Sequence, residues 1–227
     1  VSYVDKASEK RIVERLHELL PEAGFIAEEG SGSLEEQEYC WVVDPLDGTS
    51  NYIHDCTPYC VSIALRNREE ILLGVVYECG REELFWAHKN SRAYLNGKEI
   101  CVSDQSVLDQ SFIMPELPYK AERYSPFILP LMRDLYGHVS GIRMLGSAAA
   151  ELCYVAAGRF EIFIEAFLGP WDIAAGYIIL KQAGGRMTDF SGNSNGPDAK
   201  EVLASNGKVH EELLKVLQRH KKLLKHE

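Results

Sequence analysis

Apolar and polar positions divide the chain into two differently patterned parts. In the first part, apolar residues at helical spacing predict one helix, which Asp5 can begin and Pro21 ends (Ile12, Leu16, Leu19 and Leu20). Apolar runs then predict strands at residues 40–43, 59–65, 71–78 and 84–88, and Asn96-Gly97 is typical of a hairpin turn between 93–95 and 99–101. Because no helical pattern separates these strands, their sheet is expected to be largely antiparallel.

From about residue 106 the pattern alternates between strand and helix. It predicts strands at residues 112–114, 141–144 and 160–164, and helices near 127–135, 148–157, 173–183 and 209–224. The proline-rich residues 115–126 indicate a surface loop, either a plain connector or a specificity element beside a pocket. The pattern alone therefore predicts an α plus β protein with two subdomains, residues 1–105 and 106–227.

The segment Trp41-Val42-Val43-Asp44-Pro45-Leu46-Asp47-Gly48-Thr49 carries the strongest chemical signal. Its apolar strand leads into Asp44 and Asp47, which share a turn and can face one hard cation through oxygen ligands. Gly48 lets backbone N–H groups approach an anion, and Thr49 adds a hydroxyl that can orient a water. A plain surface turn would explain the proline and the glycine, but not the apolar run that delivers the acids. The segment therefore predicts a metal-held phosphate.

Two further acidic signals are weaker when taken alone. Asp172 stands in the first turn of the helix after Gly169-Pro170, where a simple N-cap would suffice. Glu28 and Glu29 follow an apolar pair, and adjacent surface acids are common. Residues 28–38 have almost no apolar side chain, so their order is expected to depend on an ion held by Glu28.

Composition narrows the class of protein. With 227 residues and 46% hydrophobic content, the chain can bury one large core or two smaller ones. A net charge of −10 argues against a nucleic-acid surface, and no run has the length of a membrane span. The six cysteines include no C-x-x-C pair, which predicts reduced core thiols in a cytoplasmic protein. The histidines form no metal-binding spacing, so an all-oxygen site favours Mg²⁺ over Zn²⁺.

The combination of these blocks resembles the inositol monophosphatase family of magnesium-dependent phosphatases. The matching blocks are Val4-Asp5, Glu28-Glu29, residues 44–51, 59–63, 146–149 and 171–176. The resemblance implies a layered αβαβα sandwich with a pocket where its halves meet. Most metal ligands would then lie in residues 1–105, whereas Asp172 and the substrate contacts would lie in residues 106–227.

The resemblance also implies a ligand set. Glu28, Asp44 and the Leu46 carbonyl would hold the first Mg²⁺, and Asp44, Asp47 and Asp172 the second. Glu28 would assist a third ion through water. Carboxylates that share one pocket repel each other, and two to three Mg²⁺ ions would remove that conflict.

Roles in catalysis and in substrate binding follow from the same resemblance. Asp5 and Thr49 would orient the attacking water, and Glu29 is a further catalytic candidate. The amides of Gly48 and Thr49 would hold the phosphate. The organic part of the substrate would contact Glu165 and the turn formed by Gly146, Ser147 and Ala148. Glu151, on the helix after this turn, is expected to face solvent by default, with the substrate or a subunit interface as alternatives.

The substrate is less sharply indicated than the chemistry. Asn51-Tyr52 is similar to the inositol-phosphatase and fructose-bisphosphatase branches of the family. Hydrolysis of inositol 1-phosphate is therefore expected, with fructose 1,6-bisphosphate as the alternative and 3′(2′),5′-bisphosphate nucleotides or histidinol phosphate after it. A non-enzymatic role as a protein partner in transcription complexes stays open, and a homodimer is expected. Family members usually carry a helix and a mobile loop before the position of Asp5, and without that loop the third ion would lose its assistance.

Overall fold

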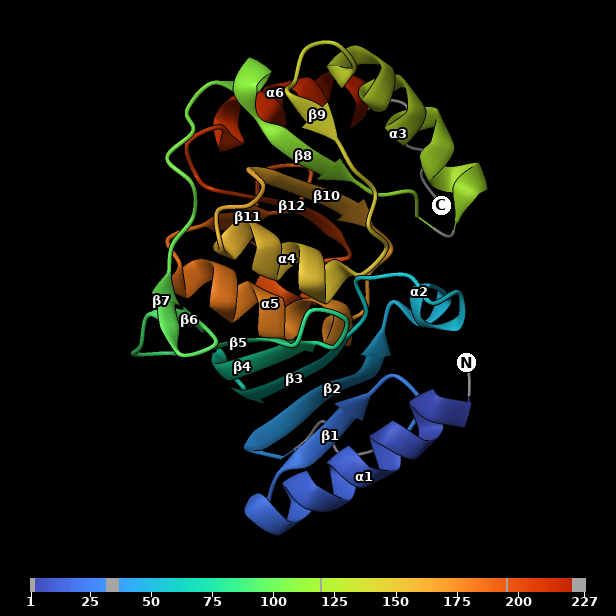
Figure 1. Ribbon diagram of the computed structural model, residues 1–227, viewed down its shortest axis with the longest axis vertical. Coiled ribbons are helices and arrows are strands. Elements are labelled where there is room, and N and C mark those ends of the chain that lie inside the picture. Colours follow the sequence, from blue (N-terminus) through green and yellow to red (C-terminus); the bar gives the residue numbers. More distant parts are fainter. Residues whose placement is uncertain (1–2, 32–36, 119, 195, 222–227) are drawn as a thin grey trace.

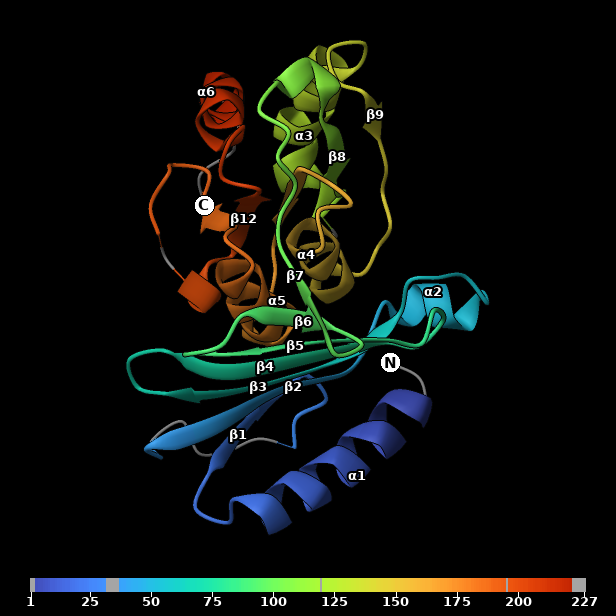
Figure 2. The ribbon, with the colours of Figure 1, turned by 60° about the vertical axis from the view of Figure 1, so that its left-hand side comes forward.

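Five alternating layers of helix and sheet are stacked along the long axis of the molecule (Figures 1 and 2). They are seen in a computed structural model that describes residues 3–31, 37–118, 120–194 and 196–221. From bottom to top in Figure 1, the layers are α1, a seven-stranded sheet, the pair α4 and α5, a five-stranded sheet, and the pair α3 and α6. The predicted αβαβα sandwich is confirmed.

The lower sheet follows the order of the chain. Helix α1 (Tyr3–Leu19) packs beneath a sheet whose strands lie in the order β1 to β7. These strands are β1 (Gly24–Ala27), β2 (Tyr39–Asp47), β3 (Cys60–Asn67), β4 (Ile71–Glu78), β5 (Glu83–His88), β6 (Ala93–Leu95) and β7 (Lys98–Ile100). All neighbouring pairs are antiparallel except β1 and β2, so the expectation of a largely antiparallel sheet is correct.

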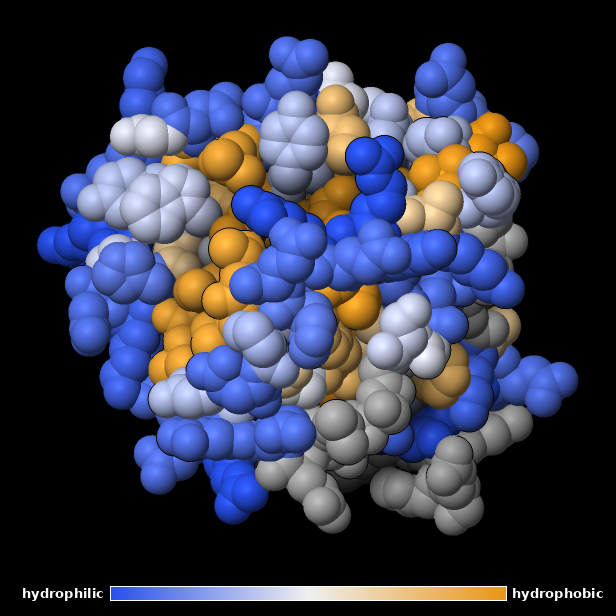
Figure 3. Space-filling view, turned by 90° about the horizontal axis from the view of Figure 1, so that it is seen from below, coloured by the Kyte–Doolittle hydropathy of each residue, from blue (hydrophilic) through white to orange (hydrophobic). Residues whose placement is uncertain are grey.

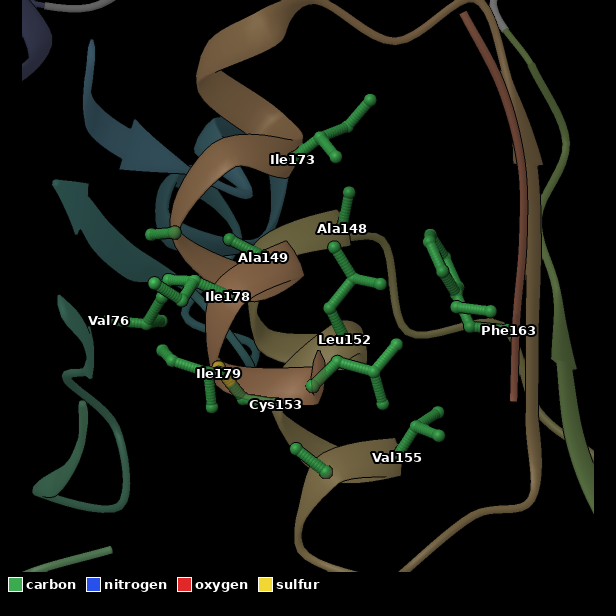
Figure 4. Packing of buried hydrophobic residues seen from close by; sticks show 14 of the residues in the cluster. Val76, Ala148, Ala149, Leu152, Cys153, Val155, Phe163, Ile173, Ile178 and Ile179 are labelled. Atoms are coloured by element: carbon green, nitrogen blue, oxygen red, sulfur yellow. The ribbon is translucent and has the colours of Figure 1, made fainter. Parts of the chain in front are cut away.

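The middle layer joins the two sheets. Helices α4 (Ala148–Ala156) and α5 (Pro170–Gln182) are apolar on almost every side because a sheet covers each face of the layer. Figure 4 shows Leu152 and Cys153 of α4 facing α5, with Val76 on the lower-sheet side and Phe163 on the upper-sheet side. This cluster draws residues from both parts of the chain, so the N-terminus of each middle helix is placed rigidly beside the end of β2.

The upper sheet has the order β11, β12, β10, β8, β9. Its strands are β8 (Phe112–Pro115), β9 (Gly141–Ile142), β10 (Ile162–Ala166), β11 (Arg186–Thr188) and β12 (Glu201–Ser205). Helices α3 (Ala121–Leu135) and α6 (His210–Lys221) cover it from above and enclose a second apolar cluster. A short helix, α2 (Thr49–Ile53), follows β2 at the side of the stack.

Several expectations from the sequence were wrong in detail. Strands β1, β11 and β12 were not predicted, because each is only three to five residues long. The predicted loop at 115–126 ends at Ala121, where α3 begins six residues before the predicted start. Burial of Tyr124, Phe127 and Leu131 against the upper sheet stabilises α3 despite its two internal prolines.

The cysteines are also less uniform than predicted. All six are free; Cys40, Cys60 and Cys153 are buried, as expected of core thiols. Cys56 and Cys101 are exposed, so the expectation was wrong for these two. Among the described helices, none is both long and apolar enough to cross a membrane.

The face below the lower sheet is only partly covered by α1. Side chains along β3 alternate: Ser62 and Ala64 are buried, whereas Ile63 and Leu65 are partly exposed beside α1. Figure 3, which views the molecule from below, shows apolar surface gathered in the middle of this face with polar side chains around it.

Candidate metal and active site

The end of β2 is irregular, and this irregularity presents the two aspartates of the motif. The pairing of β2 with β3 shifts register between Asp44 and Asp47, and Pro45 occupies the gap. Extra residues of this kind bend a strand and redirect its side chains. The Asp44 Oδ1 atom accepts a hydrogen bond from Leu46 N at 2.9 Å, which fixes the turn. The strand therefore continues to Asp47 rather than ending at Val43 as predicted.

Gly48 is required where β2 passes into α2. Its φ is 85°, in the left-handed region that favours glycine. A Cβ atom at this position would also lie 2.9 Å from the Pro58 carbonyl oxygen. Only glycine lets the chain turn here and place the first N–H groups of α2, which lack partners within the helix, beside the cavity.

Asp47 links the motif to the middle layer. Its Oδ2 atom accepts hydrogen bonds from Ser147 Oγ at 2.7 Å and from Ala149 N at 2.8 Å. Asp47 thus caps α4 from a distant part of the chain, where a carboxylate is favoured by the helix dipole. The buried Ser147 hydroxyl is engaged by Asp47, and Ser147 is absent from the residues that line the cavity described below.

Asp172 enters from the N-terminus of α5. Gly169 is the N-cap and Pro170 follows it, and the Asp172 Oδ2 atom accepts a hydrogen bond from Gly169 N at 2.6 Å. The capping role expected of Asp172 is therefore present, and its role as a metal ligand stays a prediction. Asp44, Asp47 and Asp172 each offer an oxygen, and these oxygens lie within 4.8 Å of one another.

Helix α1 supplies Asp5 to the same region. Asp5 is 1% exposed, and its Oδ1 atom accepts a hydrogen bond from Thr49 Oγ1 at 3.0 Å. The same hydroxyl lies 3.0 Å from the Leu46 carbonyl oxygen. A hydroxyl carries one proton, so Thr49 donates to only one of these two acceptors at a time.

Glu28 lies at the rim, and its neighbour Glu29 does not line the cavity. The backbone here is held by Glu9, a buried side chain of α1 that the sequence did not single out. The Glu9 carboxylate accepts hydrogen bonds from Glu29 N at 2.8 Å and Ser31 N at 2.9 Å. The order of residues 28–31 therefore has a protein contribution, whereas residues 32–36 of the predicted ion-dependent segment lie outside the described residues. The catalytic role of Glu29 stays a prediction.

These groups surround a cavity of about 380 Å³. Its lining contains six carboxylates and, among the described residues, no basic side chain; the acids are Glu28, Asp44, Asp47, Glu116, Glu165 and Asp172. The other lining residues on the path of a substrate include Gly48, Thr49, Gly146 and Ala148. The structure thus brings together most of the residues expected from the sequence, and their individual roles stay predictions.

Burial and the crowding of acids raise the pKa values of the carboxyl groups. Burial, followed by the charges of Asp47, Glu28 and Asp172, raises the pKa of Asp44 well above its usual value. Burial and then the charge of Asp47 raise the pKa of Asp172 to about 7. Burial also raises the pKa of Asp47, although its hydrogen bonds from Ser147 and Ala149 oppose the shift.

These residues fit a hard divalent cation. All donors are oxygens, three of them converge, and the raised pKa values report negative charge that lacks a nearby cation of the protein. Asp44, Asp47, Asp172, Glu28 and the Leu46 carbonyl are the groups placed to hold it. Mg²⁺ suits such carboxylate sites, and Zn²⁺ would be expected to recruit nitrogen or sulfur ligands.

Two acids near the turn at Gly146 were not assigned a role from the sequence. They lie on the side of the cavity that Glu116, Gly146 and Glu165 form, here called the alcohol side. Glu116 follows β8, in the stretch predicted to be a loop, and it is 8% exposed. Glu151, on α4, is 0% exposed, so the expectation that it faces solvent was wrong. Spacing on the helix indicated its side but could not indicate its depth, because a second helix and both sheets enclose α4.

Comparison with known proteins agrees with this geometry. A sequence model described as the inositol monophosphatase family matches residues 1–222. The chain is 36% identical over 217 residues to the fructose-1,6-bisphosphatase/inositol-1-monophosphatase of Thermotoga maritima, covering 96% of this chain and 82% of that protein. It is 38% identical over 216 residues to the Nus factor SuhB of Escherichia coli K12, covering 94% and 80%.

Solved structures show the same likeness. The Thermotoga maritima IMPase aligns with a TM-score of 0.90 at 34% identity, covering 99% of this chain and 85% of that chain. The structure titled inositol monophosphate bound SaIMPase-II aligns with a TM-score of 0.86 at 28% identity, covering 97% and 87%.

Proposed function

Because the chain belongs to the inositol monophosphatase family, we propose that it hydrolyses a polyol phosphate monoester with Mg²⁺, and that inositol 1-phosphate is its preferred substrate. The chain is a phosphoric monoester hydrolase. The observation that carries the finer proposal is the convergence of Asp44, Asp47 and Asp172 beside the hydrogen-bonded pair Thr49 and Asp5.

Two sets of groups would hold the phosphate ester in the cavity: the metal ligands through the ions, and the N–H groups at the start of α2 directly. Asp44, Asp47 and Asp172 would share the ions, with Glu28 and the Leu46 carbonyl completing the ligands. The chemistry that Mg²⁺ supplies when bound is activation of a water and neutralisation of charge on the phosphate ester. Gly48 and Thr49 line the same cavity, and their N–H groups would hold the phosphate oxygens.

Thr49 and Asp5 provide the route for the proton. When the Thr49 hydroxyl donates to Asp5, its proton lies toward the Asp5 carboxyl group. A lone pair of Thr49 Oγ1 then accepts a hydrogen bond from the attacking water and orients it toward phosphorus. Asp5, buried and next to Thr49, is the group that takes up the proton.

The name of one relative supports fructose 1,6-bisphosphate as a second candidate substrate. The Thermotoga maritima relative is named for both fructose-1,6-bisphosphatase and inositol-1-monophosphatase activity. Dual activity is therefore the alternative for this chain, ahead of a bisphosphate nucleotide or histidinol phosphate.

A non-enzymatic role is the alternative from another class. Relatives named Nus factor SuhB motivate it, because that name describes a factor and not an enzyme. The complete set of site acids favours the enzyme, since a protein-binding surface has no need of a buried carboxylate cluster.

Phosphate release from inositol 1-phosphate, fructose 1,6-bisphosphate and adenosine 3′,5′-bisphosphate, each with and without Mg²⁺, tests the proposal. We expect Mg²⁺-dependent release that is fastest with inositol 1-phosphate. Absence of release from every ester, by folded protein at saturating Mg²⁺, would contradict the enzymatic proposal and favour the protein-binding role.

A further inference from the structure

Glu151 is a buried acid whose charge has no partner. It is 0% exposed, and no described N–H or O–H group donates to either of its carboxyl oxygens. An ionised carboxylate in such a place is strongly unfavourable. Burial, the charge of Glu116 and a carboxyl–carboxyl hydrogen bond with Glu116 raise the pKa of Glu151 well above its usual value. Burial therefore favours the protonated form of Glu151, whose proton can be shared with Glu116.

Glu116 is the member of this pair that lines the cavity. Its Oε1 atom accepts a hydrogen bond from Leu145 N at 2.6 Å, and Gly146 N lies 3.4 Å from the same oxygen. These N–H groups fix the Glu116 carboxyl group against the turn before α4. Glu116 is thus held in one orientation, with part of its side chain lining the cavity.

The same contacts position the turn before α4. Gly146 adopts a φ of 74°, and Asn51 Nδ2 donates to the Leu145 carbonyl at 2.6 Å from the opposite side. The turn is therefore clamped between Asn51 and Glu116. Because Gly146 lines the cavity, any movement of Glu116 changes the surface that faces the alcohol of a substrate.

Glu165 completes this side of the cavity. It lines the cavity from β10, and after burial the charge of Glu116 is the next largest cause that raises the pKa of Glu165. Lys120 Nζ lies 4.5 Å from the centre of the Phe167 ring, but Lys120 is not among the residues that line the cavity. This side of the cavity therefore presents carboxyl oxygens to a substrate and, among the described lining residues, no basic side chain.

We propose that Glu116 is a specificity-determining residue: held by Glu151 and the Leu145–Gly146 amides, it forms with Glu165 an acidic wall that binds the hydroxyls of a polyol monophosphate and disfavours a second phosphate. This inference rests on the proposed phosphatase function. Glu151 acts through Glu116 and is a positioning residue. The wall favours a neutral polyol over the bisphosphate alternative because hydroxyl groups donate to carboxylates, whereas a second phosphate is repelled by them.

The test compares two esters that differ by one phosphate, fructose 1-phosphate and fructose 1,6-bisphosphate. We expect the wild type to have the higher kcat/KM for the monophosphate. Glu116→Gln keeps an oxygen for the Leu145 amide but removes the charge, and should shift the ratio toward the bisphosphate by about tenfold, as one like-charge contact in a partly desolvated site implies. Glu122→Gln, an exposed acid in the first turn of α3, is the matched control and should leave the ratio unchanged.

Glu151 is tested by rescue. Glu151→Gln retains a buried donor for Glu116, whereas Glu151→Met does not. We expect Glu151→Met to raise KM for fructose 1-phosphate several-fold with kcat less affected, and Glu151→Gln to stay close to wild type. Equal behaviour of the two variants would overturn the positioning role.

Other outcomes separate this inference from the proposed function. A wild type that hydrolyses both esters equally well, or a Glu116→Gln ratio that does not move, overturns the acidic wall while leaving the phosphatase intact. Loss of bisphosphate hydrolysis in Lys120→Met would also overturn it, because a second phosphate would then be bound by that lysine. If the wild type hydrolyses neither fructose ester, phosphate release from inositol 1-phosphate decides whether the proposed function holds, and calorimetric affinities of both fructose esters with Mg²⁺ decide the preference.

Discussion

Each aspartate of the D-P-L-D motif has one oxygen committed to the fold. Asp44 Oδ1 is bound to the Leu46 amide, and Asp47 Oδ2 is bound to the start of α4. These bonds fix the plane of each carboxylate before a cation arrives, which reduces the reorganisation needed on binding. The cost is a cluster of acids whose pKa values are raised in the metal-free protein.

Asp44→Asn should separate catalysis from stability. The amide oxygen can still accept from Leu46, but charge is lost from both proposed ion sites, so turnover should fall about a thousandfold. Removing a repelled buried charge should leave the melting temperature of the metal-free protein equal or higher. Asp5→Asn, which removes the proton acceptor beside Thr49 but leaves the charge of both proposed ion sites, should lose less activity. Turnover of Asp44→Asn within tenfold of wild type at saturating Mg²⁺ would show that Asp44 is not a shared ligand.

Glu165→Gln tests whether Glu165 binds the hydroxyl groups of the substrate. A charge-assisted hydrogen bond to a substrate hydroxyl contributes about 1.5–3 kcal/mol, so kcat/KM for inositol 1-phosphate should fall roughly tenfold or more. Hydrolysis of an aryl phosphate, which offers no hydroxyls, should change little. Equal losses on both substrates would mean that Glu165 serves the metals or the fold.

At the scale of elements, α1 is amphipathic in an unusual way. Asp5, Glu9, Ile12 and Leu16 follow each other at helical spacing and face the sheet, so one stripe changes from acidic to apolar along the helix. The apolar end anchors α1 under the lower sheet. The acidic end orients Thr49 and holds the backbone after β1.

Glu9→Gln tests whether this tether supports the metal site. The amide keeps one acceptor and turns an NH₂ group toward a backbone N–H, so stability should fall by about 1–3 kcal/mol. Because Glu28 lies next to the tethered residues, the Mg²⁺ concentration for half-maximal activity should also rise. Amide exchange at Glu29 and Ser31 should become faster. Glu14→Gln, on the exposed side of the same helix, should change none of these.

At the scale of the whole molecule, both halves of the chain contribute residues to one cavity. Acidic side chains line this cavity, and no basic side chain among the described lining residues balances them. A carboxyl whose folded pKa lies above its unfolded value stabilises the protein at low pH and loses that contribution as pH rises through the folded pKa. For Asp172 that window runs from about 4 to about 7. The homodimer expected from the family resemblance stays a prediction, which light scattering would check.

Melting curves with and without Mg²⁺ test this balance. Between pH 6.5 and 8 the metal-free melting temperature should fall, and Asp172→Asn should flatten the slope. Burial lowers the pKa of His210 to about 4, so this histidine does not oppose the fall in melting temperature between pH 6.5 and 8. Mg²⁺ at about 100 times its Kd should add about 2.7 kcal/mol, or roughly 5–10 °C, with a larger gain at pH 8. A melting temperature indifferent to both pH and Mg²⁺, in active protein, would contradict the charge-balance account.

The sequence by itself determined the class of chemistry. Asp44, Asp47, Gly48 and Thr49 lie within one short turn, so their geometry is set by local backbone rules. The pattern of apolar residues predicted most strands of the lower sheet. It also predicted helices α1, α4 and α5, which carry or border the site residues. Strand β11 has three residues, as β6 and β7 do, but no hairpin turn such as Asn96-Gly97 marked it in the sequence, and it escaped prediction.

Only the tertiary structure decided what the remaining acids do. Glu9, Glu116 and Glu151 are ordinary glutamates in the sequence, and their meaning depends on partners 20 to 35 residues away, such as Glu29 for Glu9 and Leu145 for Glu116. Ser147 likewise points at Asp47 because α4 is capped from β2. Local patterns specify the side chain, whereas burial and the nearest charge, which determine protonation and orientation, arise only when separate layers pack together.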